Sequence, residues 1–410
     1  MATLTPTPSA LGTSSRALAP DLARGFMLLL IALANTPWYL YGSSTSSSSI
    51  HSTDGSTLDR AVQFVIITAV DSRVYPMFAF LFGYGIVQMY QRSVDRGAEP
   101  RAVRRVLRRR HLWMIVIGGL HAALLWMGDI VGAYGLVGLI FTAAFLKRRN
   151  KTLIVWASVF TGLLTLAAVF AAIGSVFAAQ SPPPAEADNF LAGIKDINGI
   201  ESWPASILPR LGVWVFLLAF QGLLTLVVPV AVLLAFWAAR HRVLEEPERH
   251  RRLLTRTAVV GIAVGWGGGA VHALQHVGVL PIPDHVGWVF SATQSMTGLF
   301  GGLGYVAVFG LIAAALTRRS PTSGPVAAAI GAVGKRSLSS YLAQSVIFAP
   351  LLCAWGLGLG AVLGSAGVAA LAIGVWLVTV VGCSMLERRG LRGPAEWLLR
   401  RLAYGRSADS

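Results

Sequence analysis

One stretch decides how this chain folds: Asp71-Ser-Arg-Val-Tyr-Pro-Met-Phe-Ala-Phe-Leu-Phe-Gly-Tyr-Gly85, inside an apolar segment from about residue 61 to 89. That segment is long enough to cross a membrane, which takes ~20 residues for ~30 Å of hydrocarbon. A charge at that depth costs about 2.5–3.5 kcal/mol, so Asp71 and Arg73 should face the protein interior or a water-filled cavity. Pro76 removes a backbone donor, which predicts a helix break between Asp71 and Pro76. The stretch therefore predicts a functional site, with an ion pair that only fixes helix packing as the alternative.

The composition places the chain among helical membrane proteins. It is 55% hydrophobic and only 13% charged, and apolar runs of membrane-spanning length recur from Phe26 almost to the end. The alternating segments of a β-barrel do not occur. The net charge of +16 lies in short loops between apolar runs, which argues against nucleic acid as a partner. Cys353 and Cys383 both fall in apolar runs, so no disulfide framework is predicted.

The apolar runs predict an all-α polytopic bundle of about ten transmembrane spans. These spans are about Leu22–Tyr41, Ala61–Met89, Leu112–Met127, Ile130–Leu146, Thr152–Phe177, Leu211–Ala239, Thr257–Val277, Gly287–Leu316, Ser337–Leu357 and Ala361–Leu386.

The segments between the spans divide the chain into two membrane halves. Residues 1–19 are expected to be disordered, residues 20–177 form the N-terminal half, and residues 211–386 form the C-terminal half. Between the halves, residues 178–210 form a long loop with room for an interfacial helix. Residues 42–57 are expected to be a flexible polar loop, residues 318–335 a basic connection, and residues 387–410 a basic tail.

The basic residues predict the orientation in the membrane. With ten spans, 30 of the 34 Lys and Arg residues lie on the side of the N-terminus, and four lie on the other side. Cytoplasmic loops carry the excess of positive charge, so both termini are predicted to be cytoplasmic in the plasma membrane. The arginines between residues 92 and 110 should contact anionic lipid there. The alternative that the first span is a signal peptide, cleaved after Ala32-Leu-Ala34, is disfavoured by the apolar and aromatic residues that follow.

Two further spans contain polar residues that could take part in catalysis or binding. His121 follows Gly118-Gly119, and imidazole suits proton transfer near neutral pH, although it could also serve only in interhelical hydrogen bonding. Asp129 is eight residues further on, so the two side chains could not touch on one straight helix. Asp129 is instead expected to close the site near the outer surface or to cap the next helix. Arg24 either snorkels to the interface or binds a phosphate or carboxylate.

A histidine cluster near the end of the seventh span is weaker evidence for a site. His272, Gln275 and His276 place two imidazoles four residues apart, a spacing that can share a metal. No carboxylate or cysteine is adjacent in sequence. Hydrogen bonding is therefore the preferred interpretation, and no metal is predicted.

Five stretches together resemble the YeiB-like family of bacterial membrane proteins, whose C-terminal part is the domain of unknown function 418. They cover residues 20 to 406. The matching residues are Pro20-Asp-Leu-Ala-Arg-Gly25 with Ala34-Asn35; the stretch 71–83; Gly119-Leu-His121 with Leu125-Trp126-Met-Gly-Asp129; Gly334-Lys-Arg-Ser-Leu-Ser-Ser-Tyr341 with Gln344-Ser345; and Gly393-Pro-Ala-Glu-Trp397 with Tyr404-Gly405.

This family looks remotely similar to transmembrane acyltransferases. The resemblance implies an acyl-coenzyme A donor from the cytoplasm and a hydroxyl or amine acceptor from the outer side. His121 would be the general base or a transient acyl carrier, with Asp71 orienting His121 or Arg73. Further candidate residues, for donor binding, oxyanion stabilisation or substrate contacts, are Arg24, Asn35, Arg73, Tyr75, Trp126, Asp129, Tyr341 and Gln344.

The competing interpretation is a transporter or exporter that uses the same intramembrane charges without covalent chemistry. In either case the expected partners are the bilayer and a small-molecule or lipid substrate, and a homodimer is left open.

Overall fold

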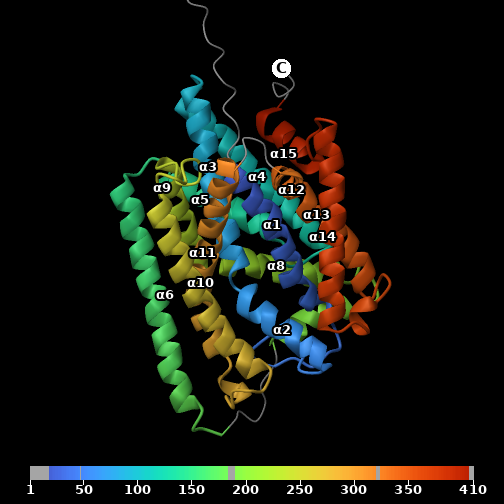
Figure 1. The fold of residues 1–410 in the computed structure, drawn as a ribbon. Coiled ribbons are helices and arrows are strands. Elements are labelled where there is room, and N and C mark those ends of the chain that lie inside the picture. The colour runs from blue at the N-terminus through green and yellow to red at the C-terminus, as the bar shows by residue number, and fades with distance from the viewer. Residues whose placement is uncertain (1–17, 47, 183–189, 320–323, 406–410) are drawn as a thin grey trace, which may run out of the picture.

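The computed structural model describes residues 18–46, 48–182, 190–319 and 324–405, and these ranges are helical without a β-strand (Figure 1). The α-helices are α1 (Leu18–Asn35), α2 (Thr57–Ala69), α3 (Val74–Asp95), α4 (Pro100–Leu124), α5 (Ile130–Phe145), α6 (Asn150–Ala178), α7 (Phe190–Asp196), α8 (Ile207–Ala219), α9 (Val227–Arg240), α10 (Arg251–His276), α11 (Val289–Arg319), α12 (Pro325–Lys335), α13 (Ser337–Leu352), α14 (Ser365–Arg388) and α15 (Pro394–Tyr404).

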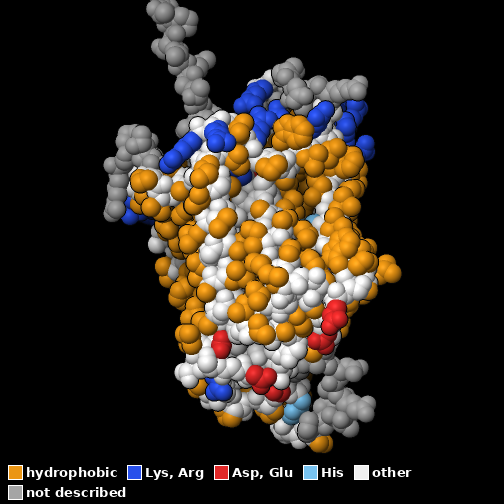
Figure 2. All heavy atoms as spheres, turned by 90° about the vertical axis from the view of Figure 1, so that its right-hand side faces the viewer, with side chains coloured by type: hydrophobic (Ala, Val, Ile, Leu, Met, Phe, Trp, Pro, Cys, Tyr) orange, Lys and Arg blue, Asp and Glu red, His pale blue; other side chains and the backbone are white. Residues whose placement is uncertain are grey.

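Seven described helical segments are long and apolar enough to cross a membrane, which confirms an all-helical membrane protein. They are Leu18–Tyr39, Thr57–Asp95, Asn150–Ala178, Ile207–Leu224, Arg251–His276, Val289–Arg318 and Ser365–Arg388. Figure 2 shows a broad apolar band, with Lys and Arg side chains gathered at the end where α15 and the C-terminus lie in Figure 1. We call this the basic end. Carboxylates lie toward the opposite end of the face shown.

The expected break in the second span is confirmed. α2 ends at Ala69 and α3 begins at Val74, and Ser72 between them has a positive φ of 61°. A left-handed residue cannot continue a helix, so the charged residues on either side of Ser72 lie in an irregular turn. Their backbone and side-chain groups must therefore find partners on other helices.

A second break was not predicted. The expected sixth span, Leu211–Ala239, is divided into α8 and α9 by a π-helical turn over Phe220–Leu224 and by Leu226, whose φ is 59°. Nearly all of α9 is buried, and it packs along α3. The sequence did not reveal the break because residues 211–239 are mostly apolar throughout, whether they lie on the exposed α8 or in the buried α9.

Two segments taken for connections form helices. The expected basic connection 318–335 contains α12, and the expected basic tail contains α15. α12 meets α1 at very close range: a side chain at Gly25 would lie 2.0 Å from the Ile330 carbonyl oxygen. On the other side of the same crossing, a side chain at Gly334 would lie 1.9 Å from the Asp21 carbonyl oxygen. Glycine at both positions is what permits this contact.

The expected flexible loop before α2 is largely packed against the helices. His51 in this loop is completely buried, and Ser49 and Ser52 beside it are buried too. The loop is held partly by α7, where Lys195 donates to Ser43 Oγ at 2.8 Å and to the Ile50 carbonyl at 3.2 Å. The hydrogen bonds of this loop, rather than apolar content, explain its order.

Lys195 should make the stability of this region depend on pH. Burial lowers its pKa from 10.5 to about 8, so between these values the unfolded chain binds the proton more readily than the folded one. Folding stability should therefore rise as the pH is raised from 8 toward 10.5, by at most roughly 3 kcal/mol. Thermal unfolding of wild type and Lys195→Met at several pH values tests this. If the hydrogen bonds lost in Lys195→Met contribute little, the difference in stability between the variant and wild type should narrow as the pH rises. A stability difference that does not change with pH would contradict the prediction.

Candidate functional site

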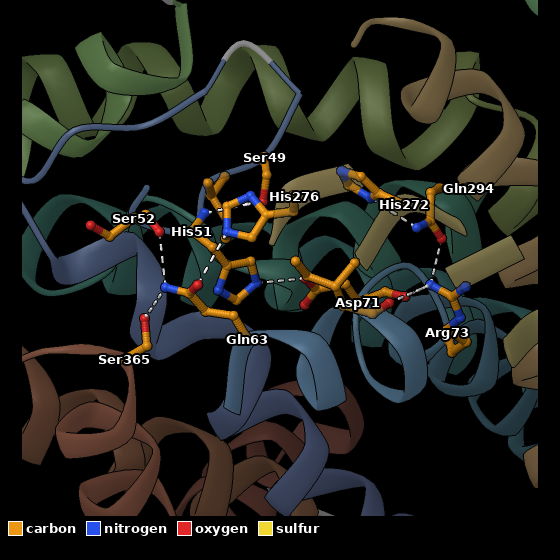
Figure 3. A network of polar contacts seen from close by, with 12 residues as sticks. Ser49, His51, Ser52, Gln63, Asp71, Arg73, His272, His276, Gln294 and Ser365 are labelled. Atoms are coloured by element: carbon orange, nitrogen blue, oxygen red, sulfur yellow. Dashed lines mark hydrogen bonds and ion pairs between the residues drawn. The ribbon is translucent and has the colours of Figure 1, made fainter. Parts of the chain in front are cut away.

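The polar residues buried among the helices form two separate groups. One, which we call the dyad site, is built on His121 and Asp129. The other, which we call the histidine network, contains His51, Asp71, His272 and His276 and is drawn in Figure 3. In the described ranges, no hydrogen bond or ion pair joins His121 to Asp71 or Arg73.

His121 and Asp129 form a buried pair, with Nδ1 of His121 2.7 Å from Oδ2 of Asp129. Their side chains are 3% and 0% exposed. The other carboxylate oxygen, Oδ1, accepts from the Gly132 amide at 2.8 Å and so caps α5. The expectation that Asp129 caps the next helix is confirmed, and the same carboxylate also binds the histidine.

The contact is possible because α4 ends earlier than expected. The predicted third span reached Met127, but α4 ends at Leu124, and the amides of Leu125 and Trp126 both donate to the His121 carbonyl. The chain then turns back, so eight residues of sequence separation no longer mean ~12 Å along a helix axis. A glycine supports the hairpin, because a side chain at Gly118 would lie 2.3 Å from the Gly132 amide nitrogen.

The pairing determines which nitrogen of His121 could act as a base. An ionised Asp129 can only accept hydrogen bonds, so beside it the neutral form of His121 carries its proton on Nδ1 and keeps the lone pair on Nε2. Within the described part of the chain, Nε2 is buried without a hydrogen-bond partner. An oriented imidazole nitrogen without a partner can act as a general base toward a substrate proton within hydrogen-bond reach.

Aromatic residues surround the pair. The ring of Tyr341 from α13 lies edge-on to His121, with ring centres 5.3 Å apart, and its hydroxyl accepts from the Ile130 amide at 3.3 Å. Trp126 stacks on Tyr39 with ring centres 4.5 Å apart. Both are buried, and neither the Trp126 Nε1 nor the Tyr39 hydroxyl has a partner among the residues described. The site therefore presents two donors without acceptors beside the histidine hairpin.

An arginine from α8 adds positive charge to this region. Arg210 is 1% exposed and interacts electrostatically with Tyr39 and Cys353. Nη2 reaches the Trp203 carbonyl at 3.5 Å, while Nε and Nη1 have no partner among the described residues. Trp214, one turn further on, lies over the α4–α5 hairpin at Gly119 and Gly132. A buried guanidinium without a carboxylate can stabilise an anion that forms or binds there.

The histidine network lies around the break between α2 and α3 (Figure 3). Asp71 contacts Nε2 of His51 at 2.8 Å. The His51 ring lies edge-on to His276, and His276 contacts Oε1 of Gln63 at 3.3 Å. Gln63 in turn donates to Ser365 Oγ at 2.8 Å. The preferred interpretation of His276 as a hydrogen-bonding residue is confirmed.

Arg73 is completely buried and contacts no carboxylate among the residues described. It donates to the carbonyls of Ile67, Asp71 and Gly265 and to Oε1 of Gln294, whose amide nitrogen lies 2.9 Å from Nδ1 of His272. Glycines of α10 and α11 make room for it: a side chain at Gly269 or Gly301 would lie within 2.6 Å of Arg73. Arg73 thus ties α2, α10 and α11 to the turn.

The predicted site residues are distributed over four places. His121, Trp126, Asp129 and Tyr341 meet in the dyad site, and Gln344, one turn beyond Tyr341, is buried and donates to the Leu28 carbonyl at 3.2 Å. Asp71 belongs to the histidine network and Arg73 lies beside it, and Tyr75 is the second residue of α3. Arg24 lies 3.6 Å from Asp21 and donates to the Leu81 carbonyl at 2.9 Å. Asn35 is the last residue of α1 and precedes the 3-10 turn Thr36–Tyr39, for which its side chain makes no cap hydrogen bond within the described residues.

Several residues of both groups were missed from the sequence. Tyr39, Arg210 and Trp214 were not proposed for any site, and His51 lay in the loop expected to be flexible. A signal was present for Arg210, since it is one of the four basic residues on the side that is poor in positive charge. The aromatic residues carry no such signal, because an apolar span normally contains them.

The chain is similar to several bacterial proteins without a described function. Residues 238–406 match the family described as "Protein of unknown function (DUF418)". The chain is 25% identical to the uncharacterized protein YxaH of Bacillus subtilis, over 96% of this chain and 95% of YxaH. It is 26% identical to the uncharacterized protein YeiB of Escherichia coli, over 80% of each chain. A 39.9 kDa uncharacterized protein of Bacillus acidopullulyticus is 31% identical over 37% of this chain and 39% of its own.

Proposed function

This chain belongs to the YeiB-like DUF418 family of membrane proteins, and from its dyad site we propose that it transfers an acyl group to a hydroxyl or amine acceptor. The observation that carries the proposal is the buried His121–Asp129 pair at 2.7 Å, which leaves Nε2 of His121 without a partner in the described chain. A histidine oriented by a carboxylate is a common arrangement for activating an oxygen or nitrogen nucleophile.

The proposed donor is an acyl-coenzyme A. Nε2 of His121 takes the proton of the acceptor hydroxyl while its oxygen attacks the thioester carbonyl. The carbon–sulfur bond then breaks, and the departing thiolate receives the proton from His121, so the charges balance. The Tyr39 hydroxyl, Trp126 Nε1 and the Arg210 guanidinium are donors without an acceptor among the described residues, and we propose that they stabilise the tetrahedral oxyanion. Asp129 holds the ring and stabilises the imidazolium.

We propose a role for Arg73 that differs from the one the resemblance implied. Its guanidinium already binds three carbonyls and Gln294, so we assign it to holding the helices and assign the oxyanion role to Arg210. Arg24 of α1, which contacts Asp21 and the Leu81 carbonyl, remains the proposed contact for donor phosphates. Tyr341 and Gln344 are proposed to line the acceptor side of the site.

The proposed orientation has about ten spans in the plasma membrane, with both termini and the segment 92–111 in the cytoplasm. It rests on the 30 to 4 division of basic residues. A single cysteine introduced at Glu99, with Cys353 and Cys383 replaced by alanine, should resist a membrane-impermeant maleimide in intact cells and react after permeabilisation. Labelling of intact cells would overturn the orientation.

The function is tested with the purified full chain and radiolabelled acetyl-coenzyme A. Release of free thiol should exceed that of heat-denatured protein, and label should move into extracted lipids or cell-envelope glycans. Because the acceptor is not specified by the site, both fractions are counted. If neither lipids nor glycans support thiol release, and the protein moves a solute across proteoliposomes, the proposal of acyl transfer is wrong and transport is the function.

The transporter interpretation has one observation of its own. Two helical segments, α2–α3 and α8–α9, are broken within the bundle, and the first break carries Asp71 and Arg73 beside three histidines. Interrupted helices and chains of Asp and His are arrangements that proton-coupled transporters use. This alternative predicts that His51→Gln stops transport, whereas acyl transfer at His121 would not require His51.

A further inference from the structure

A cavity at the basic end has the composition of a phosphate-binding site. It has a volume of about 360 Å³ and lies between the N-terminal part of α4 and the C-terminal part of α5. Four arginines of α4 and three residues of α5 line it, with His111 between them. The lining residues are Arg101, Arg104, Arg105, Arg108, His111, Leu139, Thr142 and Ala143.

The four arginines form one face of α4 because they are spaced 3, 1 and 3 residues apart. None of them forms an ion pair with a carboxylate within the described ranges, although carboxylates elsewhere in those ranges pair with Arg242, Arg249 and Arg318. Arg101, Arg105 and Arg108 are exposed, so solvent screens much of the repulsion between them, and an anion between them would relieve the remainder. Their arrangement suits a ligand with at least two negative charges.

The wall of the cavity supplies a second and independent observation. His111 is completely buried, and neither of its ring nitrogens has a hydrogen-bond partner in the part of the chain described. Thr142 is 7% exposed, and its hydroxyl likewise has none there. Burying such groups without partners costs free energy, which a ligand oxygen would offset. The His111 ring is fixed in place, since a side chain at Gly138 would lie 2.7 Å from it.

We propose that this cavity binds a phosphate ester, with a diphosphate or a terminal phosphate held by the arginines and a less polar group against Leu139 and Ala143. Arginine binds phosphate through two parallel hydrogen bonds, which explains why guanidinium groups rather than lysines line the cavity. The phosphate belongs either to an anionic lipid headgroup or to a soluble ester such as coenzyme A. The proposal does not depend on acyl transfer, because it concerns binding alone.

Binding is measured by titration calorimetry on the full chain in phosphatidylcholine nanodiscs, with inorganic pyrophosphate and coenzyme A as probes. Wild type should bind one pyrophosphate. Arg104→Gln/Arg108→Gln should weaken binding by about 100-fold, or about tenfold for each charge-assisted contact. The control is Arg96→Gln/Arg109→Gln, which removes the same charge from neighbouring exposed arginines outside the cavity and should change affinity by less than about threefold.

A second variant separates a loss of binding from a loss of folding. Thr142→Val removes a hydroxyl that has no partner among the described residues, so it should leave the melting temperature unchanged or raised while weakening pyrophosphate binding several-fold. Adding phosphatidic acid to the nanodiscs distinguishes the sources. Competition with pyrophosphate supports a lipid headgroup, and tighter binding of coenzyme A without competition supports a soluble ester. No saturable binding of any probe, or equal loss in both double variants, would overturn the proposal.

Discussion

His121→Ala should reduce acyl transfer from acetyl-coenzyme A by a factor of about 10² to 10⁴, the usual contribution of a positioned general base. The reason is that Nε2 is the orphaned nitrogen in the dyad site, whose orientation depends on Asp129. Thiol release from purified protein at saturating donor is the measurement. The control is His250→Ala, a histidine whose ring contacts the His241 carbonyl away from this hairpin.

Asp129→Asn separates orientation from folding. Asparagine can still accept from the Gly132 amide, so the cap of α5 should persist and the melting temperature should change little. Its amide can present a donor to Nδ1, which would favour the tautomer with the proton on Nε2 and remove the base. The rate should therefore fall nearly as far as in His121→Ala. A large loss of stability in either variant with an unchanged rate per folded molecule would mean that the pair serves packing only.

Arg73→Met should lower the free energy of unfolding by about 3 kcal/mol or more. The substitution leaves the carbonyls of Ile67 and Asp71 and the side chain of Gln294 without their donor in a buried region, at roughly 1–3 kcal/mol for each unsatisfied group. Removing the buried charge relieves part of that cost, so the sum is smaller than the separate losses suggest. Thermal unfolding in neutral detergent is the measurement.

The matched control for this prediction is Arg60→Met, the same substitution at an exposed position in the first turn of α2. It should change stability by less than about 0.5 kcal/mol, as surface substitutions usually do. If Arg73→Met is as stable as wild type, the free energy gained from the hydrogen bonds of Arg73 only offsets the cost of burying its charge. A role of Arg73 in binding, rather than in stability, would then explain why a charged residue is buried there.

Much of the architecture follows from the sequence alone. Apolar runs of spanning length predict membrane helices, because a helix that satisfies its own backbone is the element that can cross hydrocarbon. Pro76 and the charges beside it predicted the α2–α3 break, and the placement of arginines predicted one basic end. The glycine-flanked His121 and the acid Asp129 were both selected as candidates, since polar residues are costly at that depth.

Only the tertiary structure decided which of these residues meet. Asp71 and His121 were expected to share a site, yet Asp71 pairs with His51 of a packed loop and His121 pairs with Asp129. Periodicity tells which face of a helix is polar but not which neighbour it faces, and where α4 ends depends on how the hairpin packs. Tyr39 and Arg210 lie near one another although they are 171 residues apart in sequence. Such contacts arise from helix packing, which local sequence patterns do not predict.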